Sequence, residues 1–138
     1  MKNFLIICIV ACGFIACEKD AGEGGTSVIE GQVSKIHTFQ NSSTGAMDTL
    51  YYQLDSGKDV FIIYSDNETE VYDDKFETDY NGKYNFEYLR KGDYTLYTYS
   101  DSIDVSNVKY DYPIFKHIKI NSNNSDNSVE NFVIEKNQ

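Results

Sequence analysis

Side chains that could bind a metal ion or transfer a proton are few and scattered in this sequence of 138 residues. The two histidines, His37 and His117, lie in segments expected to be β-strands, and neither has a second ligand at a metal-binding spacing. No serine lies in a nucleophile-elbow motif, and no glycine-rich loop could bind a phosphate. This inventory predicts a protein that is not an enzyme and that binds no metal ion or cofactor.

Two acidic segments carry the oxygen ligands that calcium prefers. Residues 77–82 have acidic or amide side chains at alternate positions before Gly82, like the start of an EF-hand loop. The first ligand would be Glu rather than Asp, however, and Tyr88 occupies the position of the closing glutamate. A looser group could form at one end of the domain from Asp66, Glu68, Glu70, Asp73 and Asp74. We interpret both segments as solvated turns, with a cation site in the second as the alternative.

The cysteines all lie near the N-terminus, at Cys8, Cys12 and Cys17. Lys2 precedes an apolar run over residues 4–16, which is shorter than the roughly 20 residues that a membrane-spanning helix needs. A basic start, a short apolar run and small residues before a cleavage site are typical of a secretory signal. Cleavage before Cys17 would leave one cysteine, which cannot form an intrachain disulfide and is therefore interpreted as an attachment point.

The residues up to Cys17 resemble the lipobox of bacterial lipoproteins, in the form Phe14-Ile15-Ala16-Cys17. Phe14 stands where these proteins usually have leucine. The resemblance implies that residues 1–16 are a signal peptide and that Cys17 receives diacylglycerol and acyl chains such as palmitate, which anchor the chain to a membrane. Ile9-Val10-Ala11-Cys12 fits the same pattern, but cleavage there would leave the apolar residues 13–16 on the mature protein.

The expected mature N-terminus, Cys17-Glu18-Lys19-Asp20, is similar to the export signal of Bacteroidota lipoproteins. This resemblance implies a lipoprotein of the outer membrane that faces the cell surface; the periplasmic face is the alternative. The full chain has a net charge of −10, and loss of Lys2 with the signal changes it to −11. Such a charge repels nucleic acids and anionic lipid headgroups, so the lipid on Cys17 is the expected membrane contact.

Composition divides the mature chain into a tether and one domain. Residues 17–26 are charged and rich in glycine, which predicts a flexible tether behind the lipidated cysteine. Residues 27–136 contain short apolar or alternating runs separated by turns, which predict about seven β-strands. We place these strands at 28–38, 60–64, 76–80, 84–88, 94–99, 114–120 and 129–134. The expected fold is therefore all-β, with the strand spacing of a sandwich or a barrel.

Two turns carry the most specific structural information. Asn81-Gly82 is a strong signal for a two-residue β-hairpin, because both residues tolerate positive φ. Leu89, Gly92 and Tyr94 have the spacing of a tyrosine corner, in which the tyrosine hydroxyl bonds to a backbone group a few residues upstream. The single proline, Pro113, is expected at the start of a strand, where a missing N–H is tolerated.

Residues 78–96 contain both turns and resemble the signature of carboxypeptidase-regulatory-like domains, also called transthyretin-like or Cna-B-type domains. Residues 29–33 and 130–134 are similar to the first and last strands of that family. The resemblance implies a single Greek-key β-sandwich without catalytic residues that acts as a stalk, a spacer, an accessory module or a binding surface. Lys91 stands where the family usually has proline, and the segments 39–50 and 100–113 have no clear counterpart.

Tyrosine is abundant, since the chain has twelve tyrosines and no tryptophan. Rigid amphipathic rings are favoured at surfaces that contact proteins or sugars. We therefore predict a surface that binds an extracellular protein or glycan, or other subunits of an envelope complex, at Tyr97, Tyr99, Tyr110 and Tyr112. The alternative is that these rings only cover the outer faces of a small sandwich, because strands favour tyrosine.

Two short motifs, Asp48-Thr49-Leu50 and Asp101-Ser102-Ile103, resemble the O-glycosylation sites of exported Bacteroidota proteins. Both lie in expected loops or strand edges, where modification is feasible. We therefore expect Thr49 and Ser102 to be candidates for glycosylation.

Overall fold

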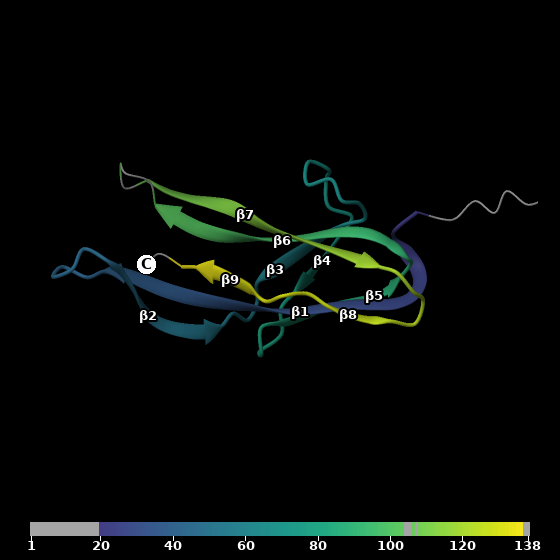
Figure 1. Cartoon of the computed structure of the whole chain (residues 1–138), viewed down its shortest axis with the longest axis horizontal. Helices are drawn as coiled ribbons and strands as arrows, with labels where there is room; N and C mark the ends of the chain where they lie inside the picture. The colour runs from purple at the N-terminus through teal and green to yellow at the C-terminus, as the bar shows by residue number, and fades with distance from the viewer. Residues whose placement is uncertain (1–19, 104–105, 107, 137–138) are drawn as a thin grey trace, which may run out of the picture.

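The computed structural model describes residues 20–103, 106 and 108–136, and these residues form nine β-strands. In chain order the strands are β1 (Glu23–Gln40), β2 (Met47–Leu54), β3 (Asp59–Ile63), β4 (Asp74–Glu77), β5 (Lys83–Leu89), β6 (Gly92–Ile103), β7 (Lys109–Ile120), β8 (Asp126–Ser128) and β9 (Phe132–Glu135). They form two sheets that pack on each other (Figure 1). The expectation of an all-β sandwich is confirmed. The described residues include no helix long and apolar enough to cross a membrane.

The long strand β1 is the centre of the first sheet. It pairs antiparallel with β5 through its N-terminal half and with β2 through its C-terminal half. Strands β8 and β9 run parallel to β1, beside residues 28–30 and 33–36 respectively. The second sheet has the order β4-β3-β6-β7, and all of its pairs are antiparallel. The chain therefore crosses from one sheet to the other after β2, β4, β5 and β7.

Two strands, β2 and β8, lie outside the seven segments that the sequence predicts. Strand β2 pairs with the extended end of β1 and takes up part of the 39–50 segment. Strand β8 is Asp-Asn-Ser and is held by backbone pairing with β1, so it has no apolar alternation that could have revealed it. The 100–113 segment is also mostly strand, because its described residues extend β6 and β7.

Two of the turn predictions need correction. Gly82 has a φ of 68°, and its N–H donates to the Asp79 carbonyl, so a tight turn forms at Asn81-Gly82. The turn joins β4 of the second sheet to β5 of the first, however, and therefore does not close a hairpin. Pro113 lies inside β7 rather than at its start. It is tolerated there because β7 is an edge strand, paired only with β6.

Apolar side chains that alternate along the strands fill a single core between the sheets. Ile29 and Val33 point inward from β1, and they meet inward-facing residues of the second sheet such as Ile62 and Leu96. Burying one such side chain stabilises the fold by roughly 1.5–3 kcal/mol. Packing of the core fixes the two sheets relative to each other. It therefore also fixes the positions of side chains on their outer faces, where a partner could bind.

The domain begins earlier than the predicted boundary at residue 27. Strand β1 starts at Glu23, and Gly22 is already buried. Residues 20–26 therefore belong to the folded domain, and the prediction that they form a free tether is wrong. Residues 17–19, including Cys17, lie outside the described part of the chain.

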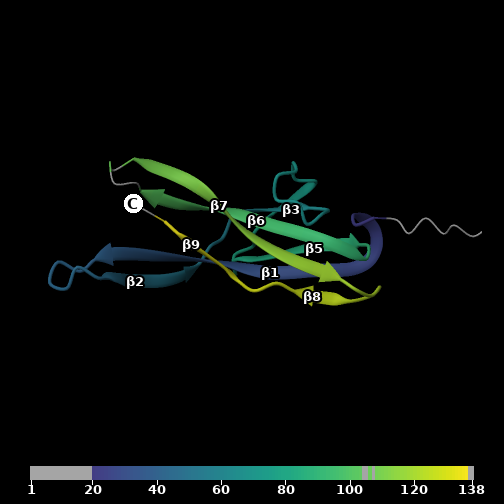
Figure 2. The same cartoon turned by 45° about the horizontal axis from the view of Figure 1, so that its top comes forward.

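The two ends of the elongated sandwich differ (Figures 1 and 2). At one end, here called the N-terminal pole, residues 20–25 lie beside the turn between β5 and β6 and the loop between β7 and β8. At the other end, the distal pole, the β1–β2 hairpin and the far ends of β6 and β7 project beyond the core. Strand β1 runs from one pole to the other.

Candidate binding surfaces

The outer face of the second sheet carries a group of aromatic rings that lies outside the core. Along β6, Tyr94 and Leu96 face the core, so the alternating residues Tyr97 and Tyr99 face outward. The register places Tyr97 between Phe61 of β3 and Phe115 of β7. Together with Tyr72, from the loop between β3 and β4, these residues form what we call the aromatic face: Phe61, Tyr72, Tyr97, Tyr99 and Phe115.

The rings of the aromatic face are in mutual contact. Phe61 and Tyr97 are stacked, with ring centroids 4.9 Å apart, and Phe61 also lies 4.8 Å from Tyr72. Tyr99 meets Phe61 and Tyr97 edge-on, at 6.0 and 5.8 Å. Tyr97 is nearly buried, at 9% exposure, whereas Tyr72 and Tyr99 are 44% and 39% exposed. The group thus has a packed base and two rings that are open to solvent.

The four tyrosines predicted as one binding surface do not share a face. Tyr97 and Tyr99 belong to the aromatic face. Tyr112 and Tyr110 pair with Ser100 and Ser102 of β6, and these positions alternate with Tyr99, so their side chains point to the opposite side of the sheet. There the rings of Tyr110 and Tyr112 lie 6.4 Å apart. Phe61, Tyr72 and Phe115 were missed, because only the strand register brings them beside Tyr97.

The acidic loop between β3 and β4 folds over one side of the aromatic face. Its carboxylates accept hydrogen bonds from the chain: Asp73 from the Tyr64 N–H at 2.7 Å, and Glu70 from the Ser65 hydroxyl at 2.9 Å. Glu68 lies 2.9 Å from Nε2 of His117. Among the described residues no three histidine, cysteine or acidic side chains are grouped as metal ligands would be. These contacts favour the interpretation of a solvated acidic loop.

The two histidines lie on different sheets. His37 is on β1 in the first sheet, opposite Tyr51 of β2. His117 is on β7 in the second sheet, where its Nδ1 lies 3.0 Å from the Thr95 hydroxyl. The structure therefore does not bring His37 and His117 together.

The candidate glycosylation sites both lie towards the distal pole. Thr49 is exposed on β2, and Ser102 is half-buried on β6. Their modification stays a prediction, with Thr49 the more accessible hydroxyl.

The segment Leu89, Gly92 and Tyr94 forms a hydrogen-bonded corner that also holds the start of the domain. The Tyr94 hydroxyl donates to the Arg90 carbonyl at 2.7 Å, the contact expected of a tyrosine corner, and accepts the N–H of Gly22 at 2.9 Å. The Arg90 N–H donates to the Gly22 carbonyl at 2.9 Å. The Arg90 guanidinium reaches the carbonyls of Asp20, Ala21 and Glu23. We call this arrangement, in which Arg90 and Tyr94 hold residues 20–23, the clamp.

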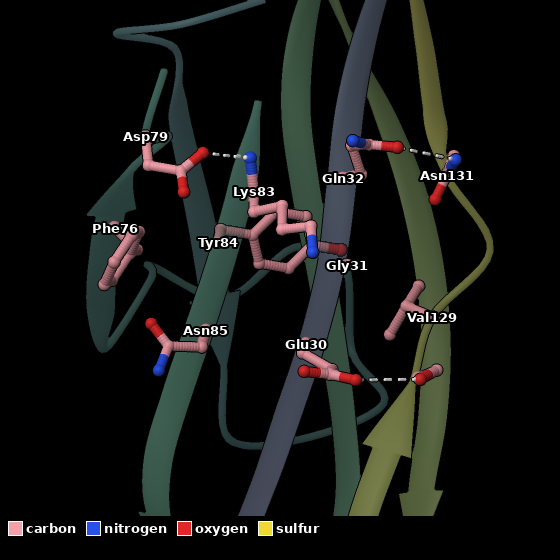
Figure 3. Close-up of a pocket in the computed structure, with 11 residues that line it drawn as sticks. Glu30, Gly31, Gln32, Phe76, Asp79, Lys83, Tyr84, Asn85, Val129 and Asn131 are labelled. Carbon is pink, nitrogen blue, oxygen red and sulfur yellow. Dashed lines mark hydrogen bonds between the residues drawn. The ribbon is translucent and has the colours of Figure 1, made fainter. Parts of the chain in front are cut away.

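A cavity of about 440 Å³ lies along β1 and β5, next to the connection between β8 and β9 (Figure 3). Its polar walls are joined by hydrogen bonds: Ser128 to Glu30 and Asn131 to Gln32, both at 3.3 Å, and the Lys83 N–H to Asp79. These bonds occupy groups that a ligand would need, so the cavity is a weaker candidate site than the aromatic face.

Tyr84 has a buried hydroxyl beside this cavity that makes no hydrogen bond. The ring extends from β5 towards Gly31 of β1, where a Cβ atom would overlap the hydroxyl (Figure 3). A buried hydroxyl without a partner costs roughly 1–3 kcal/mol. Because it is sealed from solvent, this hydroxyl is a structural cost and not a contact for a ligand in this conformation.

The buried tyrosines predict that the fold loses stability at alkaline pH. Burial raises the pKa of Tyr84, Tyr94 and Tyr97, and burial together with the Glu23 carboxylate raises the pKa of Tyr64 to about 12. Unfolded tyrosine titrates near pH 10, so between about 10 and 12 the unfolded chain loses protons that the folded chain keeps. Stability is therefore complete below about pH 10 and falls as the pH rises towards 12.

Thermal melts between about pH 8 and 11 would test this, with circular dichroism for unfolding and phenolate absorbance for titration. We expect the melting temperature to fall above pH 10, and a fraction of the phenolate absorbance to appear only with unfolding. A melting temperature that stays constant up to pH 11 would contradict the prediction.

Comparison with known proteins finds similarity among solved structures only. No protein-family model matches the sequence, and no curated protein matches it. A solved structure of a proposed carbohydrate binding protein from Pseudomonas aeruginosa is similar at a TM-score of 0.45 and 13% identity, over 84% of this chain and 92% of that one. A likeness at this level supports no conclusion about the ligand of this chain.

Proposed function

We propose that the protein is a lipid-anchored, non-catalytic binding module whose contact surface is the aromatic face. The observation that carries this proposal is the position of the five rings. A sandwich needs to bury only the inner faces of its sheets, yet here large rings gather on an outer face and two of them are open to solvent. Exposed aromatic groups of this kind are typical of binding surfaces, because ring faces bury apolar area and hydroxyls form hydrogen bonds.

The proposed domain type is the carboxypeptidase-regulatory-like, or transthyretin-like, β-sandwich. Its support is the sequence of residues 78–96, in which Tyr94 bonds to Arg90 across the turn that contains Gly92. The segments similar to the family's first and last strands also lie side by side, since β9 pairs with β1. Accessory and binding roles are what this resemblance implies.

The proposed partner is an extracellular protein or glycan. The rim of the aromatic face carries both signs of charge: Asp101 and Asp111 stand opposite each other across β6 and β7, on the side of Tyr99, and Lys75 of β4 stands opposite Phe61. Like charges in such a pair repel each other, so a basic or hydrogen-bond-donating partner group at the Asp101–Asp111 pair would relieve the repulsion. Nucleic acid would be repelled by the net charge of −10.

A binding experiment with matched variants tests the proposal. The mature domain is titrated against arrays of glycans and extracellular proteins as wild type, as Tyr72→Ala/Tyr99→Ala, and as the control Tyr80→Ala/Tyr88→Ala. The control tyrosines are 83% and 69% exposed and lie outside the aromatic face. We expect the first double variant to lose about tenfold or more in affinity while its melting curve changes little, because central aromatic residues dominate binding energies. Equal loss in both variants, or loss in neither, would contradict the proposal.

An assembly subunit of an envelope complex is the second candidate function. The observation that favours it is the outer edge of β7, a strand of 12 residues that, among the described strands, pairs only with β6. Such an edge offers backbone groups to a strand of a neighbouring protein, although Pro113 limits the pairing. This function predicts co-purification with envelope proteins and no affinity for glycans or extracellular proteins.

The anchor and the surface location are also part of the proposal. We expect Cys17→Ala to move the protein from the membrane to the soluble fraction, and protease added to intact cells to remove the wild-type domain. If the side chains of Lys19 and Asp20 direct export, replacing them with neutral residues should protect the domain from protease added to intact cells. The Asp20 substitution spares the clamp, which uses only the backbone carbonyl of that residue. A wild-type domain that is protected until the cells are lysed would place it on the periplasmic face.

A further inference from the structure

The clamp fixes the chain close to the proposed lipid attachment site. Residues 20–23 are held by the Tyr94 hydroxyl, the Arg90 N–H and the Arg90 guanidinium. Ala21 also packs against the core, and a Cβ at Gly92 would come within 2.6 Å of it. The point at which the chain leaves the domain is therefore a defined position on the N-terminal pole.

The distance between this point and Cys17 is limited by covalent geometry. Asp20 is the third residue after Cys17, and even a fully extended chain of three residue steps spans only about 10 Å. The polar region on each side of a bilayer is about 5–7 Å thick. A diacylglycerol on Cys17 that sits in the bilayer therefore holds the N-terminal pole within about 10 Å of the headgroups.

The N-terminal pole is suited to this position, because it does not share the strong negative charge of the whole chain. Its basic residues, Arg90, Lys91 and Lys119, offset its acidic residues, Asp20, Glu23 and Asp93, and Asp126 at the start of β8 adds one further negative charge. The loop between β7 and β8, residues 121–125, contains only asparagine and serine. That loop is joined to the start of β1 by bonds such as Asn124 N–H to Thr26, at 3.1 Å. A nearly balanced, polar pole avoids most of the repulsion that an acidic protein would otherwise meet at anionic headgroups.

We propose that the N-terminal pole rests on the membrane surface and that the clamp orients the whole domain, with β1 leading away from the bilayer and the distal pole outermost. This inference relies on the lipid anchor of the proposed function. Beyond the bulge at its start, strand β1 runs from Val28 to Gln40 and spans about 40 Å. The β1–β2 hairpin then stands tens of ångströms above the headgroups, and the aromatic face lies along the side of the domain, accessible to a partner.

The absence of tryptophan from the chain allows a clean test. Mature protein, residues 17–138, is coupled through Cys17 to a maleimide lipid in vesicles of phosphatidylethanolamine and phosphatidylglycerol. Asn123→Trp marks the N-terminal pole and Ser42→Trp marks the distal hairpin; both positions are exposed. Nitroxide groups on the lipid headgroups quench tryptophan at short range. We expect several-fold stronger quenching at position 123 than at position 42.

A matched variant tests whether the short, clamped connection causes the orientation. Inserting about ten glycine and serine residues between positions 19 and 20 lengthens the connection without changing the pole. Quenching at position 123 should then fall to the level at position 42. Equal quenching at both positions in the uninterrupted protein, or unchanged quenching after the insertion, would overturn the inference. Chemical coupling makes this result independent of acylation in the cell, which the Cys17→Ala fractionation tests separately.

Discussion

Replacing Tyr94 with phenylalanine should lower the free energy of unfolding by about 2 kcal/mol, because the hydroxyl satisfies one buried and one partly buried backbone group. It donates to the Arg90 carbonyl and accepts the Gly22 N–H, and both groups would lose their partner while the ring still fills its site. Urea denaturation would show a lower midpoint with an unchanged slope. Hydrogen exchange should also become faster at residues 20–23, since the clamp would keep only Arg90.

Tyr84 provides the matched control, because replacing it with phenylalanine should raise the free energy of unfolding and not lower it. Its hydroxyl is also buried but has no hydrogen-bond partner. Tyr84→Phe removes a desolvated polar group and leaves nothing unpaired, so we expect stabilisation by about 1 kcal/mol. Two variants that lose similar stability would show that the aromatic packing, and not the hydroxyls, decides both results.

Truncating Tyr97 to alanine should cost about 3 kcal/mol, the low end for a large aromatic residue that loses its packing. Tyr97 is the most buried ring of the aromatic face and contacts Phe61, Tyr99 and Phe115. The measurement is the unfolding free energy from urea denaturation of the mature domain. Lost binding in this variant would therefore say little about contact with a partner.

Tyr99→Ala is the control on the same face. Tyr99 is 39% exposed and touches the group at its edge, so we expect a cost below about 1 kcal/mol. Equal losses for the two variants would mean that Tyr99 belongs to the packed base, and Tyr72 alone would then remain as an open ring. The pair thus separates rings that support the surface from rings that are free to bind.

Local patterns in the sequence predict the strands well but not how they are paired. Short apolar or alternating runs identify the segments of β1, β3, β5, β6 and β7, and the spacing of Leu89, Gly92 and Tyr94 predicts a turn of the right kind. The grouping of tyrosines failed, because whether Tyr110 shares a face with Tyr99 depends on the register of β6 and β7. The Asn81-Gly82 prediction failed for a related reason, since the same tight turn can join two strands of one sheet or two different sheets.

The start of the domain shows a different limit of composition. Glycines and charges at residues 20–26 are typical of a flexible linker, yet here the glycines permit close packing. A Cβ at Gly25 would overlap the Leu89 carbonyl, and Gly22 has a φ of 134° beside the Arg90 side chain. The hydrogen bonds that hold this segment come from Arg90 and Tyr94, about 70 residues away in sequence. Only the tertiary structure reveals these donors and acceptors.

The course of β1 from pole to pole has a mechanical consequence. If a partner pulls on the distal hairpin while lipid holds the N-terminus, the tension runs along β1 itself. The covalent backbone of this extended strand then carries the load, and its hydrogen bonds to β5, β8 and β9 carry little of it. The same domain pulled from its N-terminus and from the end of β9 would carry the load mainly through the short β1–β9 pairing. An anchored domain of this design should therefore resist traction best when it is held at its outermost hairpin.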